Sequence, residues 1–158
     1  MVKKIADSPK VVVILLADDD ADDREMTRKA LAQNRLANEI YEVADGEQLM
    51  DFLNHRGPYA PPALSPTPGL ILLDLNMPKK DGREALAEIK ADPALRRIPV
   101  VVMTTSKAEQ DIFRAYDLGS NSFISKPITF ARLVDVMVVL GQYWFQIVKL
   151  PEAEGHQR

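Results

Sequence analysis

Acidic, hydroxyl and amine side chains follow four short strand-like runs of the sequence, at the point where each run stops. They are Asp18 and Asp19 after 11–17, Asp74 after 70–73, Thr104 and Thr105 after 100–103, and Lys126 after 122–125. Short apolar runs bounded by turn residues are typical of strands buried in a parallel sheet. Because the carboxyl ends of parallel strands meet at one rim of the sheet, we expect these side chains to lie close together.

The three aspartates of this set predict a site for a divalent cation. Converging carboxylates repel one another by about 4 kcal/mol per pair at ~4 Å and an effective dielectric constant of about 20. A hard cation, Mg²⁺ or Mn²⁺, and the amine of Lys126 would relieve that repulsion, and Mg²⁺ favours carboxylates together with waters and phosphate oxygens. The sequence therefore predicts an aspartyl phosphoryl-acceptor site. Asp20 is expected to be only the N-cap of the next helix or a loop acid.

The composition is that of an ordinary globular domain. Of the 158 residues, 46% are hydrophobic and 27% are charged, and this length suffices for a core without covalent cross-links. A net charge of −3 gives no electrostatic case for nucleic-acid binding. Cysteine is absent, which excludes disulfides and thiolate chemistry. His55 and His156 lie in a loop and in the tail, so we expect surface residues and not metal ligands.

Strand and helix patterns alternate along the chain, which predicts a parallel sheet with helices on both faces. We expect an outer strand at 39–44 and helices at 22–33, 47–54, 83–91, 109–118 and from about 129 onwards. Their expected inward-facing residues include Met26, Ala30, Ile40, Val43, Leu49, Phe52, Leu53, Leu86 and Ile89. The five prolines of 57–69 argue against a helix or central strand there and predict a stiff, extended surface loop. A domain boundary in this loop is disfavoured, because too few residues precede it.

One domain accounts for most of the chain. We assign it to residues 11–142, with an N-terminal extension at 1–10 and a C-terminal extension at 143–158 that is too short for an output domain. The apolar run 11–17 is too short to span a membrane, and it leads directly into aspartates, unlike a secretory signal. We therefore expect a cytoplasmic protein without a membrane partner.

Taken together, these motifs resemble the receiver domain of two-component response regulators over residues 11–140. The resemblance implies an α/β fold, a flavodoxin-like doubly wound (βα)5 sandwich whose five parallel strands have the order 2-1-3-4-5. It also implies that a sensor histidine kinase transfers a phosphoryl group to Asp74. The protein would then signal through altered protein–protein contacts, and it would catalyse only its own phosphorylation and dephosphorylation.

The resemblance also assigns the cation ligands. Asp18 and Asp19 would hold Mg²⁺ (or Mn²⁺) together with Asp74, and Asp19 would be the direct ligand of the acid pair. Asn76 would supply its backbone carbonyl to the ion.

The response to phosphorylation would involve residues of the last two strands. Thr104 matches the switch hydroxyl of the family, and Thr105 would be a neighbour that tunes access for partners. Lys126 matches the amine that contacts the phosphoryl group, and Pro127 would follow a cis peptide bond. Phe123 occupies the aromatic switch position.

The sequence remains apolar beyond the last expected helix. Tyr143, Trp144, Phe145, Ile147 and Leu150 would form either an exposed patch that makes a homodimer or a segment that folds back on its own domain. The proline loop and the Val-x-Leu-Pro ending resemble single-domain regulators that pair with bacterial and cyanobacterial phytochrome kinases, in which dimers through the C-terminal face are common. A bacteriophytochrome is therefore a candidate kinase.

Three other functions fit parts of the pattern. A phosphorelay intermediate would pass the phosphoryl group from Asp74 to a histidine phosphotransfer protein, and a constitutive interaction module would carry a vestigial site. Phosphatases of haloacid dehalogenase type also use an aspartyl nucleophile and Mg²⁺, but their nucleophile lies on the first strand in an Asp-x-Asp pattern. Here the acid pair comes first, and Asn76 stands two residues beyond Asp74, which argues against that class.

Overall fold

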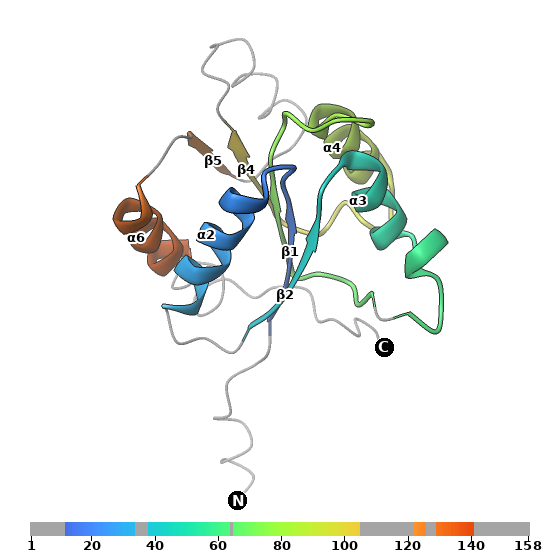
Figure 1. Ribbon diagram of the computed structural model, residues 1–158. Coiled ribbons are helices and arrows are strands. Elements are labelled where there is room, and N and C mark those ends of the chain that lie inside the picture. Colours follow the sequence, from blue (N-terminus) through green and yellow to red (C-terminus); the bar gives the residue numbers. More distant parts are fainter. Residues whose placement is uncertain (1–11, 34–37, 64, 105–121, 126–128, 141–158) are drawn as a thin grey trace, which may run out of the picture.

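A five-stranded parallel sheet has helices on both of its faces (Figure 1). The computed structural model describes residues 12–33, 38–63, 65–104, 122–125 and 129–140. The elements in chain order are β1 Val12–Ala17, α2 Ala21–Ala32, β2 Asn38–Val43, α3 Gly46–Leu53, the short 3-10 helix η1 Gly57–Tyr59, β3 Leu70–Leu73, α4 Gly82–Ala91, β4 Val100–Thr104, β5 Ser122–Ser125 and α6 Phe130–Leu140. The expected helix at 109–118 and the extensions at 1–10 and 143–158 lie outside the described residues.

The strand order is β2-β1-β3-β4-β5, which confirms the doubly wound arrangement. The chain runs outward from β1 to β2 and then returns to β3 on the other side of β1. Ala17 pairs with Val43 of β2 and with Leu73 of β3, so these three strands stop at the same level. The gap between the carboxyl ends of β1 and β3 is the point at which the winding reverses, where open α/β sheets bind their ligands.

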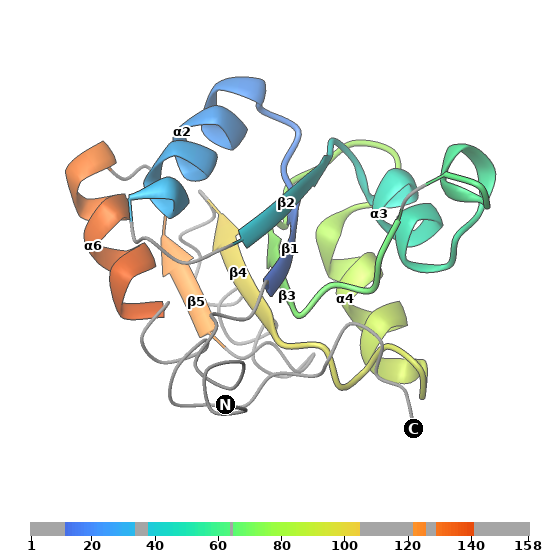
Figure 2. The same ribbon diagram turned by 90° about the horizontal axis from the view of Figure 1, so that it is seen from below.

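Both faces of the sheet are covered, which explains why its strands read as continuous apolar runs. Figure 2 shows α3 and α4 on one side of the sheet and α2 and α6 on the other. Alternate residues of each strand point to opposite faces. The core under α3 and α4 contains Leu15, Ile71, Leu73, Val102, Leu49, Phe52, Leu86 and Ile89, and the core under α2 and α6 contains Ile14, Leu16, Leu72, Val101, Ala30, Leu31, Leu133 and Met137.

Most residues expected in the core are buried, and two are only half-buried. Ala30, Val43 and Phe52 are buried as predicted. Met26 and Ile40 pack at the margin of the core under α2 and α6 and remain partly accessible. For Ile40 the reason is its position on β2, which forms an edge of the sheet.

Three aspartates begin helices that lead away from the strands. The Asp20 side chain accepts hydrogen bonds from the amides of Asp22 and Asp23 at 2.9 and 3.2 Å, which confirms its prediction as an N-cap. Asp45 caps α3. Asp81 forms a capping box with Glu84 at the start of α4. These caps fix where each loop between a strand and a helix ends.

The proline loop differs from the prediction. A helix was not expected in 57–69, yet 57–59 form the 3-10 helix η1. Pro58 is compatible with this helix because the backbone nitrogen of a residue in the first turn has no hydrogen-bond partner within the helix. The loop is also not entirely on the surface. Ser65 is 7% exposed and donates a hydrogen bond to the Tyr59 carbonyl, and Tyr59 packs against Phe52 with ring centroids 5.2 Å apart. Contact with α3 therefore folds this loop back onto the domain.

Within the described parts of the chain, the helices are too short or too polar to cross a membrane. His55 is exposed, as predicted, and its Nδ1 lies 2.9 Å from the Ser65 hydroxyl oxygen.

Candidate functional site

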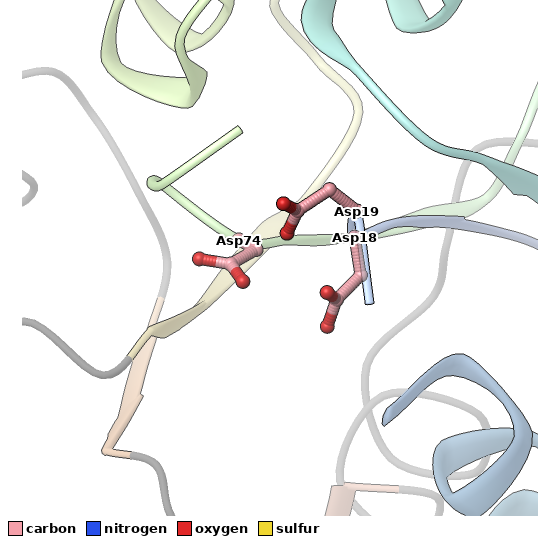
Figure 3. A group of neighbouring side chains, drawn as sticks. All are labelled: Asp18, Asp19 and Asp74. Carbon is pink, nitrogen blue, oxygen red and sulfur yellow. The ribbon is translucent and has the colours of Figure 1, made fainter. Parts of the chain in front are cut away.

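Three carboxylates gather at the carboxyl ends of β1 and β3 (Figure 3). Asp18, Asp19 and Asp74 each offer one oxygen atom, and these atoms lie within 4.8 Å of one another. Asp18 and Asp74 are buried, at 3% and 7% exposed, whereas Asp19 is exposed. The convergence predicted for these three residues is therefore present in the structure.

Asp18 is held at its amide, its carbonyl and its side chain. The amide donates to the Val43 carbonyl of β2 at 3.1 Å, which extends the sheet by one residue. The Oδ1 atom accepts a hydrogen bond from the Asp20 amide at 3.0 Å. The carbonyl accepts one from the Arg24 guanidinium at 2.7 Å. These contacts place the buried carboxylate at the rim and leave it little freedom to turn away.

Asp74 is held in a similar way by its neighbours. Its amide donates to the Ala17 carbonyl of β1 at 2.9 Å, and its Oδ1 atom accepts a hydrogen bond from the Asn76 amide at 2.9 Å. Gly82, the first residue of α4, packs directly on its backbone, because a Cβ atom at Gly82 would lie 2.4 Å from the Asp74 carbonyl oxygen. A side chain at position 82 would force this backbone to move.

The loop between Asp74 and α4 rests on the start of α3. A Cβ atom at Gly46 would lie 1.9 Å from the Lys80 carbonyl oxygen, so only glycine allows this approach. Lys79 has a left-handed backbone (φ 65°), and its Nζ lies 3.9 Å from Oδ2 of the buried Asp45. The loop that contains Asn76 is thus held both by Gly82 at the start of α4 and by Gly46 and Asp45 at the start of α3.

The geometry of the carboxylates fits a divalent cation. Two ligands on opposite sides of Mg²⁺ lie about 4 Å apart. Oxygens that lie within 4.8 Å of one another therefore reach a common ion after small side-chain shifts or through a water. Burial of two like charges is costly unless opposite charge is near, and an ion of charge +2 supplies it. Oxygen-only ligands favour Mg²⁺ or Mn²⁺ over softer metals.

The other predicted rim residues lie on β4, on β5 or beyond them. Thr104 is the last residue of β4 and pairs with Ser125, and Phe123 pairs with Val102, so both strands end at the same rim as β3. Thr105, Lys126 and Pro127 lie outside the described residues. So do the predicted dimer residues Tyr143, Trp144, Phe145, Ile147 and Leu150.

One feature of the site was not found from the sequence. Arg24 of α2 joins the Asp18 carbonyl to Glu42 of β2, at 2.7 and 3.0 Å. Its position six residues after Asp18, on a helix with many charged residues, does not distinguish it from a solvent-exposed arginine. The polar Glu42 within a strand is the only sequence signal that points to such a contact.

A parallel sheet of this order, with three acids at the reversal point, defines the receiver class of signalling domains. Residues 14–138 match the response regulator receiver domain family, and the chain belongs to that family. This confirms the resemblance seen in the sequence.

The chain is similar to regulators of phytochrome systems. It is 42% identical over 146 residues to response regulator Rcp1 of Synechocystis sp. (strain ATCC 27184 / PCC 6803 / Kazusa), which covers 92% of this chain and 97% of that protein. The crystal structure of the phosphorylated cyanobacterial phytochrome response regulator RcpA has a TM-score of 0.82 at 43% identity, covering 90% of this chain and all of RcpA. The Mn²⁺-bound form of Rcp1 has a TM-score of 0.81 at 42% identity, covering 89% and 99% of the two chains.

Proposed function

We propose that this protein is a response regulator that accepts a phosphoryl group from a sensor histidine kinase on Asp74, with the help of Mg²⁺ or Mn²⁺. The observation that carries the proposal is the convergence of Asp18, Asp19 and Asp74 at the reversal point of the sheet. The Mn²⁺-bound form of Rcp1 and the phosphorylated form of RcpA support it, because both relatives share the fold and over 40% of the sequence.

The reaction is an in-line transfer between two nucleophiles. A carboxylate oxygen of Asp74 attacks the phosphorus of a phosphohistidine, the new O–P bond forms, and the N–P bond breaks with its electron pair returning to the imidazole. The hydrogen bond from the Asn76 amide fixes the orientation of the attacking carboxylate. A bound cation supplies neutralisation of charge on the phosphoryl oxygens. Asp18 and Asp19 hold that cation, and Lys126 adds a second positive charge.

The response to phosphorylation involves residues at the β4 and β5 side of the rim. Thr104 and Lys126 contact the phosphoryl oxygens, and Phe123 changes its position in response, with Thr105 setting access for partners. Such a local charge event biases a surface between two states. The altered surface then binds another protein, and nucleic acid is not the partner, in keeping with the net charge of −3.

The kinase we propose is a bacteriophytochrome, and the assembly is a homodimer formed by the apolar residues Tyr143, Trp144, Phe145, Ile147 and Leu150. The similarity to the cyanobacterial phytochrome response regulator RcpA over 90% of the chain supports the choice of kinase. We place the protein in the cytoplasm, where such kinases present their phosphohistidine. The domain spans 11–142, between extensions at 1–10 and 143–158.

Phosphorylation of Asp74 is tested with a small phosphodonor and Mg²⁺. Intact-mass spectrometry of the wild type should show the addition of one phosphoryl group, and Asp74→Asn should show none. Asp20→Asn is the matched control, since asparagine keeps the N-cap of α2 and the residue is outside the acidic cluster. Loss of the signal in EDTA is expected as well. Phosphorylation that persists in Asp74→Asn would contradict the proposed acceptor.

A second experiment separates an endpoint regulator from a phosphorelay intermediate. Phosphorylated protein is mixed with candidate histidine phosphotransfer proteins, and the label is followed on both. Retention on Asp74 until hydrolysis supports the endpoint, whereas rapid transfer identifies a relay. The same protein without a donor should not hydrolyse generic phosphomonoesters, because the family it belongs to is not that of the haloacid dehalogenase phosphatases.

A further inference from the structure

Arg24 connects three segments that surround the acidic cluster. It lies in α2, and its side chain is 20% exposed. Its Nη1 atom donates to the Asp18 carbonyl at 2.7 Å, and its Nε atom donates to Oε1 of Glu42 in β2 at 3.0 Å. One guanidinium therefore ties the helix to both the acid loop and the edge strand. A rigid, forked donor of this kind holds two acceptors in fixed relative positions.

The contact with the Asp18 carbonyl controls the orientation of the next residue. The peptide group between Asp18 and Asp19 is planar, so an oxygen that is fixed at one side of the group fixes the plane as a whole. The Asp18 amide is already bound to β2, at 3.1 Å from the Val43 carbonyl. Because both the amide and the carbonyl of Asp18 are held, the orientation of the peptide group between Asp18 and Asp19 is fixed, and the position of the Asp19 Cα atom is fixed with it.

Asp19 depends on its backbone more than the other two acids do. The carboxylates of Asp18 and Asp74 accept hydrogen bonds from the amides of Asp20 and Asn76. The Asp19 side chain is exposed, and within the described segments it has neither a hydrogen bond nor an ion pair. The position of its oxygen near the other two is therefore set by where the backbone points.

We propose that Arg24 is a positioning residue for the cation site: through the Asp18 carbonyl it sets the direction of the Asp19 carboxylate. The inference rests on the cation-dependent function proposed above. The contacts that the structure gives Arg24 are with the Asp18 carbonyl and with Glu42, which pairs its charge, and not with a carboxylate of the acidic cluster. Its effect on cation binding therefore comes from geometry, as for partners that orient metal ligands from outside the coordination sphere.

Arg28 provides a matched control. It lies one turn further along α2, its side chain is 45% exposed, and it pairs with the other carboxylate oxygen of Glu42. Arg28→Met removes one positive charge and one contact with Glu42, as Arg24→Met does, but it leaves the Asp18 carbonyl bonded. A comparison of these two variants isolates the contact with the acid loop.

The test measures Mn²⁺ affinity by electron paramagnetic resonance of the free ion, and unfolding in EDTA as a separate readout of stability. We expect Arg24→Met to raise the Kd for Mn²⁺ by roughly 10-fold, and Arg28→Met to change it by less than about twofold. Arg24→Lys keeps the charge but cannot span both acceptors, so it should also bind more weakly than the wild type. Should Arg24→Met fail to fold by circular dichroism, Arg24→Lys decides the question.

The outcomes separate the inference from the function beneath it. Saturable Mn²⁺ binding by the wild type with unchanged affinity in both Arg24 variants would overturn the role of Arg24 alone. An equal loss in Arg28→Met would also overturn it, because the effect would then come from charge or from Glu42. Absence of Mn²⁺ binding in the wild type would overturn the proposed cation-dependent function together with this inference.

Discussion

The amide of Asp74 donates to the carbonyl of Ala17 at 2.9 Å, so the ladder between β3 and β1 continues one residue past the end of β3. This hydrogen bond fixes the proposed phosphoacceptor to the strand that delivers Asp18 and Asp19. The positions of Asp18 and Asp74 relative to each other are therefore set by the sheet itself, whereas Asp19 follows the backbone of the acid loop. Such preorganisation is what transfer to a carboxylate requires.

Removal of one acid should stabilise the protein in the absence of metal. Asp19 is exposed, so its repulsion with each neighbouring carboxylate is about 1 kcal/mol in a water-like dielectric. We expect Asp19→Asn to raise the free energy of unfolding in EDTA by on the order of 1 kcal/mol, measured with guanidinium chloride. Asp22→Asn, at an exposed acid in the first turn of α2, is the control and should give no gain. A less stable Asp19→Asn would show that repulsion does not govern this cluster.

Cation binding should in turn stabilise the wild type. A ligand that binds only the folded state adds about 2.7 kcal/mol at 100 times its Kd. We expect Mg²⁺ to raise the thermal midpoint in a concentration-dependent way, and EDTA to reverse the rise. The increase should be absent in a variant with both Asp18→Asn and Asp19→Asn. A rise of equal size in that variant would assign the stabilisation to a different site.

The close approach of α3 to the loop after Asp74 should be intolerant of a side chain. Gly46→Ala would place a methyl group 1.9 Å from the Lys80 carbonyl oxygen, so the loop must shift. We expect a loss of about 1–3 kcal/mol in unfolding free energy, as for other overpacked sites, and weaker Mn²⁺ binding because Asn76 moves with the loop. Glu47→Ala, at the exposed next residue, should leave Mn²⁺ affinity unchanged. Unaltered stability of Gly46→Ala would mean that the loop yields without cost.

Tyr59 should make stability fall at high pH. Burial first, and then the charges of Asp45 and Asp51, raise the pKa of Tyr59 above its usual value of 10.0. The neutral form of Tyr59 is favoured in the folded state. Its contribution to the unfolding free energy is therefore fully present below the pKa of the unfolded state and is lost as pH rises through the pKa of the folded state. Between about pH 9 and about pH 11, the unfolding free energy of the wild type should decrease more steeply than that of Tyr59→Phe. Phenylalanine keeps the ring contact with Phe52, and equal slopes would rule out a contribution from Tyr59.

The acidic site could be predicted from the sequence because its residues are marked by their immediate neighbours along the chain. Each of Asp18 and Asp74 directly follows an apolar run, and the ends of parallel strands bring such residues together. An N-cap was one of the two roles predicted for Asp20, and it could be predicted for the same reason, since capping involves only the next three residues. The strand order followed from resemblance to a known family, and the observed sheet confirms it.

Contacts between distant segments could not be predicted in this way. The bonds of Arg24 with Asp18 and Glu42 depend on how α2 packs beside β2, and the approach of Gly46 to Lys80 depends on the docking of a loop on a helix. The short helix at 57–59 was missed because the prediction rested on the proline content of the segment. The contact between the Tyr59 and Phe52 rings, which holds this turn against α3, is not visible in the sequence. In each case the deciding interaction joins residues that the local sequence pattern does not bring together, and the polar Glu42 within a strand gives only a weak indication of its contact with Arg24.

The chain leaves the two sides of the acidic site in opposite directions. Asp18 leads into α2, which packs with α6, whereas Asp74 leads through its loop into α4, which packs with α3 on the other face (Figure 2). A group held between these aspartates is attached at once to both helical layers. Its binding or release therefore acts on the starts of two helices, α2 and α4, that lie on opposite faces of the sheet.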